Sequence, residues 1–392
     1  MEVHLPSRHK TLTLERMAPV DVSPGSTRPR LKSAVGSWYI PISAWIISRM
    51  IGVVGLVVWP TAEGKWFNSF GLTYMDGGWY RIIMTIGYPN GPLPDFSTSW
   101  PFSPLYPFVA DLLTRLGVPV GPSLILVSWI FALVALVGIW ELTRVRFGQA
   151  VARNAVWCLA LLPGAVGQVL SYSDSMFSAG LVWLLVVIDR IVAKDDVAQQ
   201  RINHQWWLVG LLSLVVTASR PNGILVLIAV VCAVWMLQRK LINLVAATLP
   251  SILFFVSWIV YCKNKTGDPL AFLTAKNTWL ETTIVDFLSD PFERPAIVLH
   301  VATFVIAGSV AFFALKKVPI WWHVASGVLL IPSLIVGVEG LARYVSLAIP
   351  MSVLIAISIS QWSKLLRSVF FVAAASSMLF LAVNVVRSAW VP

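Results

Sequence analysis

Polar side chains that could do chemistry are few in this sequence, and they gather in short segments between long apolar runs. The first such segment, 74–91, reads YMDGGWYRIIMTIGYPNG and places Asp76 directly before two glycines. A carboxylate at that position can cap the start of a helix. A carboxylate can also act as a general base that takes a proton from a hydroxyl group. The spacing alone leaves both interpretations of Asp76 open.

The residues after Asp76 predict a short amphipathic helix. Four apolar residues share one helical face: Trp79, Ile82, Ile83 and Ile86. Such a helix is expected in the membrane interface, with its aromatic side chains at headgroup depth. Asp76 would then lie at the boundary of water and lipid, where a lipid-borne substrate arrives.

The segment WPFSPLYPF, 100–108, interleaves aromatic residues with prolines. The prolines stiffen the chain and predict that it does not form a continuous helix. Rigid aromatic surfaces suit the stacking of sugar rings, the lining of a lipid groove, or ordinary anchoring at the interface. The spacing does not choose among these three roles.

Isolated charged residues occur at three later turns. Asp174 lies in SYSDSMFSAG (171–180), Arg220 in SRPNG (219–223) and Arg343 in EGLARY (339–344). Asp174 can cap its helix and complement the helix dipole, whereas an arginine at a helix end can extend toward water or hold a phosphate. Arg343 adjoins a long apolar run and is costly there unless paired. The expected partner is a substrate phosphate or Glu339.

A second long loop carries TGDPLAFLTAKNTWLE, 266–281. Gly267, Asp268 and Pro269 are typical of a turn. The stretch that follows is amphipathic, with Phe272 and other apolar residues beside Lys276.

The elements that position these segments are membrane helices. The chain has 392 residues, 57% hydrophobic and 12% charged, against about 25% charged in soluble domains. Runs of about 20 apolar residues, enough to span a bilayer, recur throughout. The sequence predicts an all-α integral membrane protein of eleven spans: 37–59, 121–142, 150–168, 173–192, 205–219, 222–238, 242–262, 296–315, 319–337, 343–361 and 366–389.

The charges predict the orientation of these spans. The net charge is +11, and 18 of the 29 lysines and arginines fall in the segment 1–36 or in alternate turns. Basic residues mark the cytoplasmic side of membrane proteins, so 1–36 is expected to be a disordered cytoplasmic tail and the segments above to face outward. This distribution argues against a nucleic-acid partner. The three cysteines have no metal-ligand spacing, and metal dependence stays open.

Taken in order, the motifs resemble those of the GPI mannosyltransferase 2 family and its shorter bacterial relatives. D-x-x-W-Y-x-x-I is followed by G-Y, P-L-Y-P, Y-S-acid-x-x-F, S-R-x-N-G, G-D-P-L-A-F and R-Y. The resemblance runs from about residue 37 to the C-terminus. Asp174 departs from the family, which often has Glu in the Y-S-acid motif, and its role is left open.

The resemblance implies a GT-C glycosyltransferase fold, a polytopic helical bundle whose long first outer loop carries interfacial helices, with 37–392 as the catalytic domain. It implies inverting transfer of mannose from a polyprenyl phosphate mannose donor on the non-cytoplasmic face. Asp76 is then expected to be the general base, with Arg343 and Arg220 on the donor phosphate. The other residues expected to contact substrate are Trp79, Tyr80, Tyr88, Phe102, Tyr106, Asp174, Asn222, Asp268, Lys276, Trp279 and Tyr344.

Several alternatives stay open at this level. A GT-C enzyme using another sugar would share nearly every feature, and the acceptor is a glycolipid, a lipoglycan or a protein. A transporter would also be apolar and many-spanning, but it should place polar residues in the middle of its spans, where few occur here and Arg49 is the clearest. A non-catalytic scaffold would not need Asp76. The membrane is expected to be the cell membrane, or the endoplasmic reticulum in a eukaryote.

Overall fold

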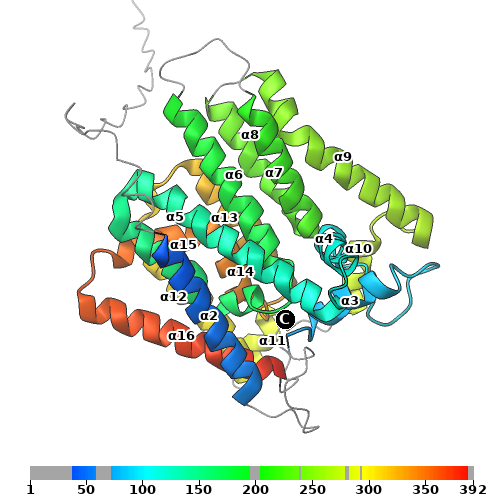
Figure 1. The fold of residues 1–392 in the computed structure, drawn as a ribbon, viewed down its shortest axis with the longest axis horizontal. Coiled ribbons are helices and arrows are strands. Elements are labelled where there is room, and N and C mark those ends of the chain that lie inside the picture. The colour runs from blue at the N-terminus through cyan, green and yellow to red at the C-terminus, as the bar shows by residue number, and fades with distance from the viewer. Residues whose placement is uncertain are drawn as a thin grey trace, which may run out of the picture. The chain divides into compact units, whose positions relative to one another are not determined.

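The computed structural model describes residues 38–58, 72–194, 204–237, 240–278, 282–291 and 294–386. These residues form helices joined by turns and irregular segments, with no strand among them. Every helix belongs to the unit Tyr39–Pro392, in which the helices pack side by side (Figure 1). The predicted tail 1–36 lies outside the described residues. The all-α architecture predicted from composition is confirmed.

Six helices of the described residues are long and apolar enough to cross a membrane. They are α2 (Tyr39–Val58), α5 (Val120–Leu161), α6 (Asp174–Lys194), α9 (Leu241–Thr266), α12 (Pro295–Phe312) and α16 (Lys364–Val386). A bent pair, α14 (Leu341–Leu347) and α15 (Ile349–Ile359), would make a seventh span. The shorter apolar helices are α4 (Leu105–Thr114), α7 (Gln205–Ser219), η2 (Pro221–Leu225) with α8 (Val226–Leu237), and α13 (Ile320–Val336).

Each of the eleven predicted spans contains helix in the structure. The ranges 121–142 and 150–168 both fall in α5 and the following η1 (Pro163–Gln168), with a break at Gly148. Gly148 has φ 82° and ψ 173°, a conformation that the absence of a side chain permits. The number of eleven crossings stays a prediction, because several helices are shorter than the roughly 20 residues that a bilayer requires.

The predicted span 343–361 is broken in two. Ala348 leaves the helical region with φ −74° and ψ 77°, and the axes of α14 and α15 differ by 83°. Pro350 near the start of α15 has no N–H group to continue the hydrogen bonds of α14. Arg343 is therefore carried by a short helix that runs in a different direction from the span after it.

The two long loops carry short helices, as predicted for the first of them. The first loop forms α3 (Asp76–Thr85) and α4 (Leu105–Thr114), and the second forms α10 (Ala271–Thr274), η3 (Ala275–Thr278) and α11 (Ile284–Ser289). The proline-rich segment is more helical than expected, since α4 begins directly after Pro104. Pro107 lies in its first turn, where no helical N–H bond is required.

Packing between these elements brings the loop helices to the ends of the spans. α3 contacts α4 and α5, while η1 contacts both α14 and α16. α14 also packs against α12 and α13. Segments from the first loop, from η1 and from α14 are thus assembled in one region, although they are far apart in sequence.

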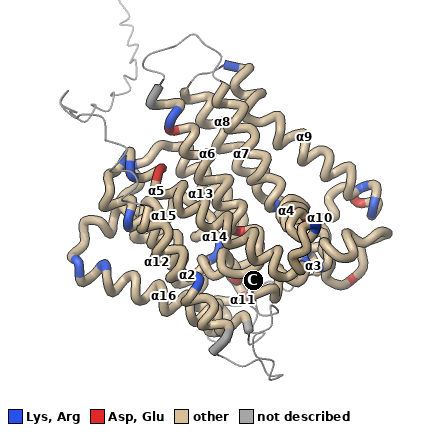
Figure 2. Tube along the Cα trace, viewed as in Figure 1, with Lys and Arg blue, Asp and Glu red and all other residues tan. Residues whose placement is uncertain are grey.

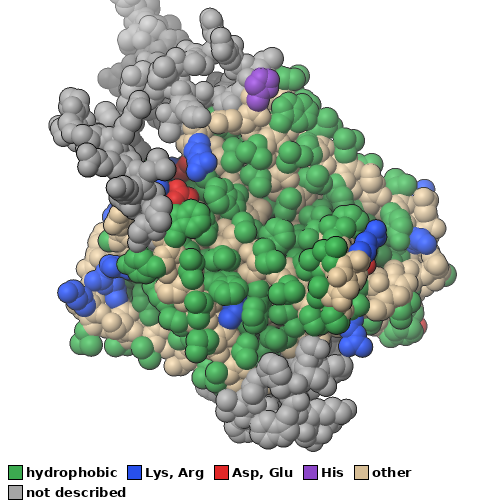
Figure 3. All heavy atoms as spheres, in the orientation of Figure 1, with side chains coloured by type: hydrophobic (Ala, Val, Ile, Leu, Met, Phe, Trp, Pro, Cys, Tyr) green, Lys and Arg blue, Asp and Glu red, His purple; other side chains and the backbone are tan. Residues whose placement is uncertain are grey.

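The outer surface of the bundle is apolar. Large hydrophobic side chains are exposed along the spans; on α9, Leu253, Val256 and Val260 are each at least half exposed. Figure 3 shows hydrophobic side chains over most of the visible face, and the lysines and arginines lie mainly toward helix ends (Figure 2). A surface this apolar suits contact with lipid. The chain is a multi-pass membrane protein.

Candidate active site

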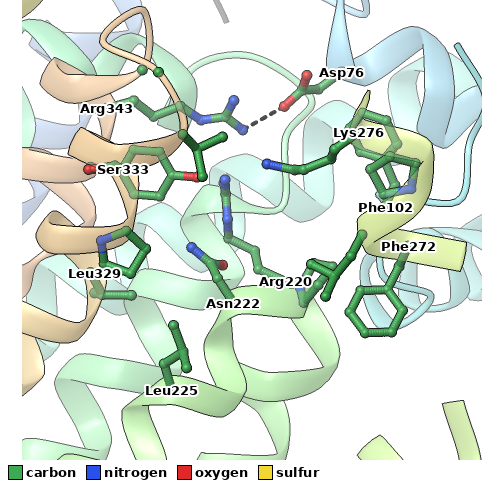
Figure 4. A pocket seen from close by; sticks show the side chains of 18 of the residues that line it. Asp76, Phe102, Arg220, Asn222, Leu225, Phe272, Lys276, Leu329, Ser333 and Arg343 are labelled. Carbon is green, nitrogen blue, oxygen red and sulfur yellow. Dashed lines mark ion pairs between the residues drawn. The ribbon is translucent and has the colours of Figure 1, made fainter. Parts of the chain in front are cut away.

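A cavity of about 470 Å³ opens where α3, η2, η3, α13 and α14 meet. Its polar lining consists of Asp76, Tyr80, Arg220, Asn222, Lys276, Ser333, Glu339, Arg343 and Tyr344. Its apolar lining includes Phe102, Ile224, Leu225, Phe255, Phe272, Leu273, Leu329, Pro332 and Val336. In Figure 4, Asp76 and Arg343 lie together at one end, while Leu225 and Leu329 lie away from them.

Asp76 is the first residue of α3, and its carboxylate contacts Arg343. Arg343 Nη2 lies 2.7 Å from Asp76 Oδ2, and the two side chains are 8% and 13% exposed. The preceding residue, Met75, has φ 53° and ψ −122°, a backbone conformation that side chains rarely adopt and that often occurs at functional sites. Asp76 is thus the first residue of α3 and faces the cavity; it is not the N-cap, because Met75 has that position and no side chain of the described residues caps this helix.

Asp174 lies behind the cavity wall and joins both arginines. Arg343 donates to it from Nε at 2.5 Å and from Nη2 at 2.7 Å, and Arg220 Nη1 forms an ion pair with Asp174 Oδ1. The Asp174 side chain is 1% exposed and does not line the cavity. A two-point contact between guanidinium and carboxylate fixes the plane of the arginine, so Asp174 orients Arg343.

Glu339 does not pair with Arg343, contrary to one of the two expectations. It accepts hydrogen bonds from the backbone N–H and the hydroxyl group of Thr282. Arg294 also contacts it, with 3.2 Å between Nη1 and Oε1. Glu339 therefore ties the second long loop to the turn before α14, and the carboxylates that satisfy Arg343 come from more distant segments.

Two neighbours of Arg343 were not singled out from the sequence. Its guanidinium lies 4.6 Å from the ring centroid of Tyr172, a cation–π contact. His300 Nδ1 accepts a hydrogen bond from the backbone N–H of Ala342 at 3.3 Å. Burial raises the pKa of Tyr172 well above its usual value, so this phenol stays protonated. Tyr172 lies within the motif SYSDS, which was the signal available for it.

Close packing at two glycines holds the acidic residues in place. A Cβ atom at Gly77, next to Asp76, would overlap Ser171 Oγ, and a Cβ atom at Gly167 in η1 would overlap Asp174 Oδ2. The backbone and the hydroxyl group of Ser171 also donate to Leu72 O, each at 2.9 Å. The first loop is therefore docked directly on the turn that precedes Asp174.

Aromatic residues of the first loop form the wall beside Asp76. The Tyr80 hydroxyl donates to Ser173 Oγ at 2.7 Å, and its ring meets Phe102 edge-on with centroids 5.2 Å apart. Burial raises the pKa of Tyr80 above its usual value, so it also stays protonated. Trp79 stacks on Phe102 at 6.2 Å but does not line the cavity. Tyr106 is fully buried and donates to Leu124 O at 2.7 Å.

Two more of the expected substrate-binding residues do not line this cavity. Tyr88 belongs to a separate aromatic group in which it stacks on Trp100 with centroids 5.0 Å apart. Asp268 accepts a hydrogen bond from the Leu270 N–H at 2.8 Å and so forms the turn before α10. Trp279 lies outside the described residues.

The remaining expected residues do line the cavity. They are Asn222, Lys276 and Tyr344. The Arg220 guanidinium lies 5.7 Å from the Tyr344 ring centroid. Within the ranges that the structure describes, no group of three or more His, Cys, Asp or Glu residues could hold a metal ion. The carboxylates of Asp76 and Asp174 contact arginine guanidinium groups instead.

Comparisons with known proteins agree with this architecture. Residues 101–262 match the family described as dolichyl-phosphate-mannose-protein mannosyltransferase, and no curated protein matches the chain. The structure is similar to ArnT from Cupriavidus metallidurans bound to undecaprenyl phosphate, with 13% identity and a TM-score of 0.56 over 87% of this chain and 64% of that one.

Two further solved structures are similar. The Archaeoglobus fulgidus oligosaccharyltransferase in complex with Zn and sulfate has 14% identity and a TM-score of 0.51, over 89% of this chain and 53% of that chain. The arabinofuranosyltransferase AftD from Mycobacteria has 15% identity and a TM-score of 0.50, over 89% of this chain and 27% of that chain. The chain thus spans less than two thirds of each of these proteins. Its helices are arranged as theirs are, and it has the GT-C fold of membrane glycosyltransferases.

Proposed function

We propose that this protein is a membrane mannosyltransferase that uses a polyprenyl phosphate mannose donor, with residues 37–392 as its catalytic domain. The observation that carries the proposal is the division of the cavity. Asp76, Arg220 and Arg343 lie on its charged side, and apolar residues of η2, α9, α10 and α13 line the rest. A polyprenyl phosphate sugar has the same division, because its charged phosphate joins a polar sugar to a hydrocarbon chain.

The reaction requires one base and a stabilised leaving group. The acceptor oxygen attacks the anomeric carbon of mannose, and its proton passes to the Asp76 carboxylate. The bond from the anomeric carbon to the phosphate oxygen breaks, and its electron pair stays on the polyprenyl phosphate. Arg343, with Arg220, stabilises the charge that develops on that oxygen. Attack opposite the leaving phosphate inverts the anomeric centre.

The comparisons support the donor class. The matched family is described by dolichyl-phosphate-mannose, and ArnT was solved with undecaprenyl phosphate bound. The sequence resemblance supports mannose and a site on the non-cytoplasmic face. The acceptor is proposed to be a glycolipid, a lipoglycan or a protein, each of which presents a hydroxyl group.

The test is transfer in vitro by the purified protein. Synthetic polyprenyl phosphate mannose is supplied with extracted lipids or peptides as acceptors, and mannosylated products are identified by mass spectrometry. Donors carrying glucose, arabinose or aminoarabinose run in parallel, because a GT-C enzyme with another sugar is the nearest alternative. The Asp76→Asn variant is the control for catalysis. Equal product from wild type and variant would contradict the enzymatic role of Asp76, and no product with any donor would favour a transporter or a scaffold.

A further inference from the structure

The charges around the cavity are unevenly compensated. Arg343 contacts both Asp76 and Asp174, and Arg220 contacts Asp174. The two positive and two negative charges are in direct contact and neutralise one another. Neither arginine is therefore an unoccupied phosphate site, and an incoming anion must compete with carboxylates that already hold them.

Lys276 also lines the cavity, and unlike the two arginines it is not paired with a carboxylate of the described residues. Its side chain extends into the cavity from η3, toward the side where Arg220 and Arg343 lie (Figure 4). Lys276 is half-buried and makes no hydrogen bond or ion pair with any residue that the structure describes. Glu339, the second acid of the lining, is engaged with Thr282 and Arg294. The cavity therefore holds one positive charge whose direct neighbours do not neutralise it.

We propose that Lys276 is the residue that first binds the anionic phosphate of the lipid donor. The identity of the sugar on that lipid rests on the proposed function, but the binding of its phosphate by Lys276 does not. An ammonium group in a partly water-excluded cavity attracts an anion more strongly than the same group at a free surface. It also requires no internal ion pair to be broken. The phosphate held by Lys276 then lies beside Arg220 and Arg343, and it contacts Arg343 as Asp76 is displaced, while Asp174 keeps both arginines in place.

The element that carries Lys276 also contacts the apolar part of the cavity. Phe272 and Leu273 of α10 line the same cavity one turn before Lys276. Phe272 and Lys276 both line the cavity, so α10 and η3 present an aromatic ring and an ammonium group to it together. That pair suits the junction of a lipid phosphate, where the hydrocarbon chain meets the charged group.

The experiment measures binding of two lipids that differ only in the phosphate. Wild type, Lys276→Gln and Lys276→Arg are reconstituted in nanodiscs and titrated with undecaprenyl phosphate and with undecaprenol. Lys263→Gln is the matched control, because Lys263 is an exposed lysine of α9 outside the cavity. Thermal unfolding of each variant verifies that it is folded.

We expect Lys276→Gln to weaken undecaprenyl phosphate binding about 10- to 100-fold, as the loss of a charged hydrogen bond would do. Undecaprenol binding should not change, and Lys276→Arg should retain most of the affinity. Wild-type affinity of a folded Lys276→Gln for undecaprenyl phosphate would overturn the inference. An equal loss for both lipids would overturn it too, because the effect would then be steric. If Lys276 governs phosphate binding but no sugar is transferred from any donor, the inference stands and the proposed function fails.

Discussion

A single nitrogen of Arg343, Nη2, lies 2.7 Å from Oδ2 of Asp76 and 2.7 Å from Oδ1 of Asp174. Asp174 also accepts a hydrogen bond from Arg343 Nε at 2.5 Å, so it holds two nitrogens of the guanidinium group. The two carboxylates are therefore not equivalent. Asp174 fixes the guanidinium from behind, and Asp76 holds the side that faces the cavity and can be replaced by another anion.

The first prediction concerns Asp76→Asn. The amide keeps the shape of the side chain but cannot accept the proton, so mannose transfer should fall about 10²- to 10⁴-fold. Donor binding should become tighter by up to about tenfold, because Arg343 no longer shares a charged contact with Asp76. Transfer rate and undecaprenyl phosphate affinity are measured on the same preparation. Weaker binding by the variant would show that Asp76 assists the phosphate and does not compete with it.

Variants of Arg343 should show how much of its contribution to stability and donor binding comes from its positive charge and how much from the planar shape of its guanidinium group. Removing this buried cation by Arg343→Ala leaves two carboxylates without their main partner, which costs about 3–5 kcal/mol in folding free energy. Arg343→Lys restores one charge but not a planar fork, so it should recover part of the stability and part of the donor affinity. Thermal unfolding and donor binding are the two measurements. Full recovery by lysine would show that the two-point contact with Asp174 is dispensable.

Asp174→Asn tests whether this residue acts through Arg343. Asp174 is 1% exposed and lies outside the cavity lining, so we expect it to position the arginines without touching substrate. The variant should lose stability and donor affinity together. Asp111→Asn is the matched control, since Asp111 pairs with Arg115 on the more exposed side of α4 and should have little effect. Normal donor affinity in a stable Asp174→Asn would contradict the positioning role.

A pair of adjacent glycines offers a geometric test. A Cβ atom at Gly77 would overlap Ser171 Oγ, whereas the nearest atom to one at Gly78 is Thr73 O at 3.8 Å. Gly77→Ala should shift the start of α3, move Asp76 away from Arg343 and lower the transfer rate, while Gly78→Ala should behave as wild type. Adding Ser171→Ala to Gly77→Ala removes the overlapping oxygen and should restore part of the rate. Equal rates for the two alanine variants would argue against close docking of this loop.

The orientation in the membrane is tested by labelling single cysteines. Asn90 lies in the first long loop, Lys316 lies in the turn before α13, and both are exposed. The distribution of basic residues predicts that a cysteine at 90 reacts with an impermeant reagent from outside and that one at 316 reacts only after permeabilisation. The reverse pattern would place the cavity on the cytoplasmic side.

The sequence by itself determined the class of protein and the location of its helices. Apolar runs long enough for a bilayer are a local property, because each helix satisfies its own backbone hydrogen bonds. Similar reasoning singled out Arg220 and Arg343 as candidates, since charged residues at the ends of apolar runs are costly unless they are paired. Asp76 was singled out by its place at the start of the helix predicted in the first long loop. The resemblance to a transferase family then gave these residues an order and an expected role.

Only the tertiary structure decided which charges meet. Asp174 and Arg343 are separated by 169 positions, and no local pattern states that they pair or that Glu339 is occupied by Arg294. The sequence also grouped Tyr88 and Tyr106 with the substrate-binding residues, but packing places Tyr88 in another aromatic cluster and buries Tyr106 beneath the cavity wall. Ion pairs and ring contacts depend on how helices pack, and packing is set by the whole bundle, whereas hydropathy is set by each segment alone.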